Sequence, residues 1–197
     1  MPGTPLRLVV GLGNPGPTYA RTRHNAGFDF VEELARRAGA ALRGEPRHQG
    51  ELARARIADQ ELWLLKPMTY MNLSGGSVQS VAGFYKIAPE AILVAHDELD
   101  FPPGVVRLKQ GGGAGGHNGL RDVMARLGEQ FWRLRIGIGH PGDRSAVLDY
   151  VLGRPPQAQA ALIQEAVSAG ADALAVMLLE GAEKAMNRLH RRGNPEP

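Results

Sequence analysis

Short apolar segments alternate with longer helix-like segments along almost the whole of this chain, and this alternation restricts its fold more than any other feature. The apolar segments are bounded by turn-forming residues, as β-strands are, whereas the helix-like segments carry apolar residues at helical spacing. The pattern predicts an α/β fold: a mixed, twisted β-sheet with helices on both faces, which is a three-layer sandwich. The strand-like segments span residues 6–12, 51–57, 61–66, 91–99, 104–110 and 133–139, and the helix-like segments span 28–38, 76–86, 119–127 and 157–190.

Local signals add detail to this outline. The second and third strand-like segments are joined by Ala58, Asp59 and Gln60 alone, which predicts a β-hairpin and therefore at least one antiparallel pair. Ser74 and Asn118 precede helix-like segments and are candidate N-caps.

The length of 197 residues and the hydrophobic content of 43% are enough for one substantial core, so a single domain over residues 1–197 is expected. The end of the chain, about residues 193–197, is expected to be a disordered tail. We find no apolar run of the roughly 20 residues that a membrane span needs, and no signal-peptide pattern. A soluble, cytoplasmic protein with no membrane partner is the resulting expectation.

The chemistry open to the chain is limited by its composition. It has no cysteine, which excludes disulfides, thiol nucleophiles and cysteine-bound zinc. The formal net charge of +3 is compatible with a polyanionic partner but does not by itself indicate one.

The first strand-like segment leads into a glycine turn, Gly11-x-Gly13-x-x-Gly16, which has the spacing of a dinucleotide-binding fingerprint. Pro15 and Pro17 remove two N–H donors from the place where a pyrophosphate would need them. This disfavours a nicotinamide oxidoreductase, so the turn requires another explanation.

A second glycine-rich segment, residues 110–119, ends in His117 and Asn118. A P-loop would instead end in Gly-Lys followed by Ser or Thr. The segment is therefore not a nucleoside-triphosphatase loop, although its amides could approach a ligand closely.

Polar residues gather just past the predicted strand ends, where ligands bind in open α/β sheets. A histidine with a carboxylate partner and several amides, without a cysteine or a serine nucleophile turn, is suited to general-base activation of water. Interpretations without a catalytic role also remain open: the acids could be solvated loop residues, and Asn72 and Asn118 could be helix caps. His96, His140 and His190 are assigned to structure or surface, and no two histidines have metal-ligand spacing on one helix. The residues past strand ends are Asn14, Tyr19, His24, Asn25, Asn72, His96, Asp97, Glu98, His117 and Asn118.

Four long blocks then resemble the bacterial-type peptidyl-tRNA hydrolases, in the family's order and over about residues 6–190. They are VGLGNPGPTYARTRHNAGF, KPMTYMNLSG, ILVAHDELDFPPGVVRLKQGGGAGGHNGLRD and RLRIGIGHPG. The resemblance implies hydrolysis of the ester between a peptide and the 3′ end of tRNA in one catalytic domain. It also implies no metal or other cofactor, no obligate protein partner, and a monomer. The opening glycine turn would be the family's active-site loop, its glycines serving close packing.

The resemblance also implies roles for particular residues. His24 would be the catalytic base and Asp97 its partner, with Asn14, Asn72 and Asn118 as the three active-site amides. The other substrate-binding positions would be Tyr19, Tyr70, Met71 and His117, and the tRNA contacts would be Arg107, Lys109, Arg135 and Arg144.

Three alternatives remain open from the sequence: an RNA-binding module without activity, a nicotinamide oxidoreductase, and a metallohydrolase. They would be separated from an ester hydrolase by tRNA binding without cleavage, by cofactor binding, and by loss of activity with a chelator, respectively.

Overall fold

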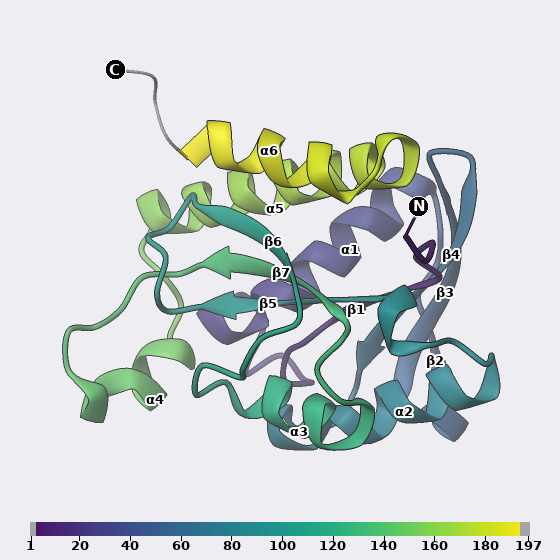
Figure 1. The fold of residues 1–197 in the computed structure, drawn as a ribbon. Helices are drawn as coiled ribbons and strands as arrows, with labels where there is room; N and C mark the ends of the chain where they lie inside the picture. Colours follow the sequence, from purple (N-terminus) through teal and green to yellow (C-terminus); the bar gives the residue numbers. More distant parts are fainter. Residues whose placement is uncertain (1–2, 194–197) are drawn as a thin grey trace.

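A computed structural model describes residues 3–193 of the chain. Within this part, one sheet has the strand order β2-β3-β4-β1-β5-β7-β6 (Figure 1). The alternating pattern of the sequence therefore gives the expected single α/β sandwich. The strands are β1 (Leu8–Gly11), β2 (Arg43–Glu45), β3 (Gly50–Ile57), β4 (Gln60–Pro67), β5 (Ile92–Glu98), β6 (Val106–Gln110) and β7 (Trp132–Gly137).

The sheet is mixed, as predicted. Its centre is parallel, with β1 between β4 and β5 and β7 beside β5. β3 runs antiparallel to β4 through a two-residue turn at Ala58 and Asp59, whose φ angles are 48° and 62°. Positive φ at both positions matches the twist of a tight hairpin, so the predicted hairpin is confirmed. The edge strands β2 and β6 are also antiparallel to their neighbours.

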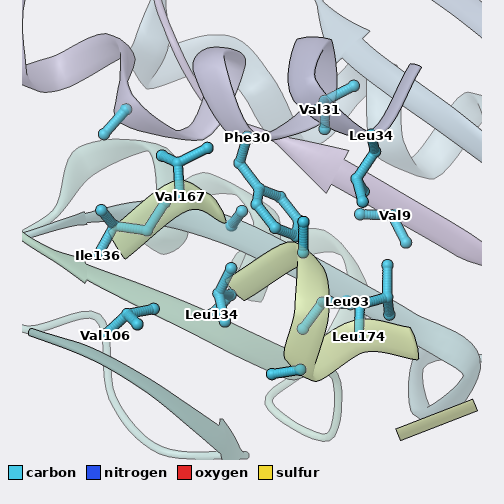
Figure 2. Close-up of a cluster of buried hydrophobic side chains, with 14 of the residues drawn as sticks. Val9, Phe30, Val31, Leu34, Leu93, Val106, Leu134, Ile136, Val167 and Leu174 are labelled. Atoms are coloured by element: carbon cyan, nitrogen blue, oxygen red, sulfur yellow. The ribbon is translucent and has the colours of Figure 1, made fainter. Parts of the chain in front are cut away.

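Helices cover both faces of the sheet (Figure 1). On one face α1 (Ala26–Ala38) and α5 (Gln157–Glu180) enclose a core in which Phe30 lies among Leu134, Val167 and Leu174 (Figure 2). On the other face α2 (Ser74–Phe84) and α3 (Asn118–Leu127) cover a second core. The remaining helices are α4 (Val147–Val151) and α6 (Ala182–Gly193).

The glycines of the opening turn allow the first turn of α1 to lie directly on the strand ends. A methyl group on Gly11 would lie 2.0 Å from the carbonyl oxygen of Gly27, and one on Gly27 would lie 2.4 Å from that of Ala95. A methyl group on Gly13 would meet the ring of Phe28 at 2.6 Å. Gly11 and Gly13 serve close packing, as expected, and the packing brings the start of α1 to the carboxyl end of β5. Gly16 does not: its Cβ position is open, and its φ of 101° is one that favours glycine.

Several boundaries differ from the predictions. The single helix expected over residues 157–190 is divided at Gly181, whose φ of 98° is not helical, into α5 and α6. The cap of α3 is His117, whose ring nitrogen accepts the N–H of Leu120; Asn118 is already the first residue of the helix. Ser74 likewise is the first residue of α2 and not its cap. β2 was missed because its three residues are all exposed and carry no apolar alternation. Of the expected tail, Gly193 is the last residue of α6, and residues 194–197 lie outside the described part.

By length and composition alone, α5 is long and apolar enough to span a membrane. The search of the sequence for an unbroken apolar run of about 20 residues did not detect it. Its side chains Ile163, Val167 and Leu174 are buried in the core beneath it. A core helix of a globular protein passes the same test, so α5 is weak evidence for a span.

Candidate active site

Two histidines share one buried carboxylate at the carboxyl edge of the sheet. Asp97, near the end of β5, is 4% exposed. His24, in the short 3-10 turn Arg23–Asn25 before α1, places Nδ1 2.8 Å from Asp97 Oδ2. His117, the cap of α3, places Nε2 2.8 Å from Asp97 Oδ1. The structure therefore brings together three of the residues predicted for the site.

The hydrogen-bond partners assign different tautomers to the two rings. His24 donates its Nδ1–H to the carboxylate, which leaves its Nε2 as a free proton acceptor. His117 donates its Nε2–H to the carboxylate and accepts the Leu120 N–H on Nδ1 at 3.2 Å. Since both nitrogens of His117 are used, His24 is the member of the pair that can act as a base.

Charge and burial affect the pKa values of these groups in opposite directions. Burial lowers the pKa of His24, but the charge and hydrogen bond of Asp97 outweigh it and hold the pKa above its usual 6.5. Burial would raise the pKa of Asp97, but the two imidazoles hold it well below its usual range, so this group stays ionised. Neighbouring His96 is different: burial, together with His117, lowers its pKa to about 3, which keeps the ring neutral.

Asn14 is fixed from two sides in the loop after β1. Its Oδ1 accepts the Met71 N–H at 2.7 Å. Its backbone N–H donates to Asn25 Oδ1 at 2.8 Å, and its carbonyl accepts from Asn25 Nδ2 at 3.0 Å. Asn14 Nδ2 is thus the group left to meet a ligand. Asn25 was named in the sequence as a polar residue past a strand but was given no role; its position beside His24 was the available signal.

The other two predicted amides, Asn72 and Asn118, are adjacent in sequence to residues that contact this site. Asn72 follows Met71, and Asn118 lies between His117 and Gly119, whose Cβ position would be 2.5 Å from Met71 Sδ. Both side chains are exposed, unlike that of Asn14. Asn118 Oδ1 accepts from Arg121 at 3.2 Å.

Of the remaining predicted lining residues, Tyr70 and Met71 directly precede Asn72 in the sequence, and Tyr19 lies five residues after Asn14. Met71 is buried, Tyr19 is half-buried and Tyr70 is exposed.

A polar cavity of about 250 Å³ lies beside the site, over β5, β7 and β6. Lys109 and Arg135 line it together with His96, the acids Glu98 and Asp100, and the glycine-rich loop. With Arg133, three cations face two acids, and we call this space the basic cavity. Arg135 is paired with Glu98 at 2.6 Å, whereas Lys109 is exposed and has no ion-pair partner among residues 3–193.

Arg133, which the sequence did not single out, also lines this cavity. It is buried, and its guanidinium donates to the carbonyls of Gly112 and Gly113, so it ties the glycine-rich loop to β7. Arg133 and Arg135 lie two residues apart in the same strand-like segment, and nothing in the local sequence indicates that the first of them is buried and binds the loop.

The other two predicted tRNA contacts are not brought to this cavity. Arg107 donates to the carbonyl of Leu189 at 3.0 Å and so holds α6 against β6. Arg144 is exposed in the 3-10 turn Arg144–Ala146.

His24, Asp97 and His117 are also the group, among the described residues, whose ligand atoms lie close enough to hold a metal ion, within 4.8 Å of one another. The imidazole-to-carboxylate distances of 2.8 Å are those of hydrogen bonds, so in this arrangement the facing nitrogens carry protons and are not free ligands.

Comparisons with known proteins agree on one family. The family model described as "Peptidyl-tRNA hydrolase" matches residues 8–196. A peptidyl-tRNA hydrolase of Nitrosomonas europaea is 55% identical over 189 residues, which cover 95% of this chain and 97% of that protein. One of Yersinia enterocolitica is 54% identical over 187 residues, covering 94% and 95% of the two chains. The crystal structure of peptidyl-tRNA hydrolase from Acinetobacter baumannii matches with a TM-score of 0.91 at 51% identity, over 93% of this chain and 94% of that one.

Proposed function

Because this chain belongs to the peptidyl-tRNA hydrolase family, we propose that it cleaves the ester between a peptide and the 3′ end of tRNA with water activated by His24 and without a metal. The observation that carries the proposal is the 2.8 Å bond from His24 Nδ1 to Asp97, which leaves Nε2 free. The same resemblance supports one catalytic domain that acts in the cytoplasm as a monomer, without an obligate protein partner.

In the proposed reaction, His24 Nε2 removes a proton from water as the water oxygen attacks the ester carbonyl carbon. The carbonyl oxygen becomes an oxyanion, for which Asn14 Nδ2 is the pre-positioned donor. The resulting imidazolium is stabilised by the Asp97 carboxylate. It then returns its proton to the 3′ oxygen of the ribose as the carbon–oxygen bond breaks, which leaves free tRNA and a peptide carboxylic acid. At neutral pH the acid loses its proton to solvent and becomes the carboxylate.

An amide-lined site of this kind should also distinguish peptidyl-tRNA from aminoacyl-tRNA. Amides can pair with the first peptide bond of an acylated substrate. A free ammonium at the same place would be desolvated without a partner, which is unfavourable.

The decisive assay compares N-acetyl-aminoacyl-tRNA with the same tRNA bearing the unacylated amino acid, each with an exhaustive chelator present. We expect rapid release of tRNA from the acetylated substrate and little from the other, with no effect of the chelator. Activity that is lost with the chelator and restored by a divalent cation would favour the metallohydrolase, with His24, Asp97 and His117 as ligands. Binding of tRNA without cleavage would favour the RNA-binding module, and binding of a nicotinamide cofactor would favour the oxidoreductase.

We propose that Lys109 and Arg135 bind phosphates of the tRNA, because both line the basic cavity beside His24's carboxylate partner. Lys109→Gln should weaken tRNA binding and reduce the slope of log Kobs against log salt by about 1, the effect of one lost phosphate contact. Arg135→Gln should also weaken binding, although that guanidinium is already paired with Glu98.

Lys184→Gln on α6 removes the same charge far along the chain and serves as the control. If the Lys109 and Lys184 variants have equal salt slopes, the cavity is not part of the phosphate-binding surface.

A further inference from the structure

An open groove of about 930 Å³ lies at the same edge of the sheet as the catalytic group, and among the roles described above it shares one residue, the predicted substrate contact Tyr70. One wall is formed by the segment between β4 and α2, and the other by the link between β2 and β3. Its residues include Pro15, Glu45, Glu51, Met68, Tyr70 and Leu73. Pro15 follows Asn14 and Tyr70 precedes Met71, so the groove continues directly from the proposed site.

The strand order separates this groove from the basic cavity. The groove lies at the ends of β4, β3 and β2, whereas the cavity lies over β5, β7 and β6. The catalytic carboxylate on β5 and Asn14 after β1 lie between the two regions (Figure 1). A substrate bound at the catalytic group can therefore extend in two opposite directions.

The two regions differ in chemical character. The groove exposes two large apolar side chains, Tyr70 at 62% and Leu73 at 53%. Its acids are Glu45 and Glu51, of which Glu51 already lies 3.8 Å from Lys66, and its one arginine, Arg126, is engaged by Gln79 and Asp122. Such a surface favours apolar and cationic groups and disfavours phosphates.

We propose that this groove binds the peptide of peptidyl-tRNA, beyond the residue that carries the ester. The inference rests on the proposed function. The scissile ester joins two chemically different parts: the ribose side continues into phosphates, which require the basic cavity, so the acyl side extends the other way. There it meets apolar side chains and the exposed carboxylate of Glu45, which suit a peptide with apolar or basic side chains.

The test compares an N-acetylated tetrapeptidyl-tRNA of apolar residues with an N-acetylated single aminoacyl-tRNA. Leu73→Ser should lower the ratio of kcat/KM for the long substrate to that for the short one by about five- to tenfold, since part of a leucine contact is lost. Leu179→Ser, the same change at a 67% exposed position on α5, is the matched control and should leave the ratio unchanged.

Glu45→Lys distinguishes a peptide from a nucleotide in the groove. With a peptide bound there, the variant should shift the preference from lysine-bearing to glutamate-bearing peptides by about three- to tenfold, and the single aminoacyl substrate should be far less affected. With the 3′ end of the tRNA bound there, the added cation would lower KM for all substrates equally and steepen the salt dependence.

That second result, or a Leu73→Ser ratio equal to that of Leu179→Ser, would overturn the groove assignment while leaving the hydrolase itself intact. Failure of the wild-type protein to cleave even the short substrate would instead refute the proposed function.

Discussion

His24→Ala is expected to lower kcat/KM for N-acetyl-aminoacyl-tRNA by about 10²–10⁴-fold, the usual contribution of a positioned general base. Of the two imidazoles bonded to the Asp97 carboxylate, His24 keeps an unoccupied ring nitrogen, because His117 uses both of its own. His96 also has an unpaired Nε2, but its ring bonds the backbone carbonyl of Asp97 and not the carboxylate. Alanine removes that acceptor without adding bulk. Single-turnover cleavage with saturating protein measures the loss in the chemical step separately from substrate binding.

The control for this variant is His140→Ala. His140 accepts the Gly142 N–H in an exposed loop and has no part in the proposed reaction, so its loss should leave turnover close to that of the wild type. Binding of deacylated tRNA should also survive in the His24 variant, since the proposed phosphate contacts are elsewhere. Near-normal cleavage by His24→Ala would remove the imidazole from the mechanism. A large additional loss in His140→Ala would show that the assay reports something other than the base.

Features that depend on residues close together in the sequence could be predicted from it, whereas features that depend on contacts between distant segments could not. Hairpin residues Ala58 and Asp59 lie between two apolar runs, and the pattern of the runs was enough to predict the pair. His24 and Asp97 were found as polar residues expected past strand ends, because the ends of parallel strands meet at one edge of a sheet. Asp97 in fact lies within the last residues of β5, which extends to Glu98. Their juxtaposition required the strand order, which places β5 next to β1 and which no local pattern specifies.

The roles that were missed depend on contacts between distant segments. Asn25 acts on Asn14 across the packed start of α1, and Arg133 acts on carbonyls about 20 residues earlier in the chain. Arg107 was predicted to contact tRNA, and that role stays a prediction. Its guanidinium also donates to the carbonyl of Leu189 and so holds α6 against the edge strand β6, a contact that residue type and spacing did not indicate.

The carboxylate of Asp97 provides the second large effect. Asp97→Asn should lower kcat/KM at neutral pH by about 10²–10⁴-fold, since an amide cannot accept N–H donors from both imidazoles. One ring then faces the amide nitrogen and must change tautomer or rotate. If that ring is His24, its proton moves to Nε2, the atom that has to accept the proton of water.

The pH profile separates this electrostatic role from a merely structural one. His24 must be neutral to act as a base, so kcat/KM of the wild type should fall as the pH drops through a midpoint above 6.5, the direction in which Asp97 moves the pKa. In Asp97→Asn the negative charge is gone while burial remains, and burial lowers a histidine pKa. The midpoint should therefore move to lower pH even as the plateau falls. Asp59→Asn, an exposed position with φ of 62° that asparagine tolerates, serves as the control and should keep the wild-type midpoint. A midpoint unchanged in Asp97→Asn would mean that the ionisation limiting the rate belongs to another group, and the assignment of His24 as the titrating base would then be wrong.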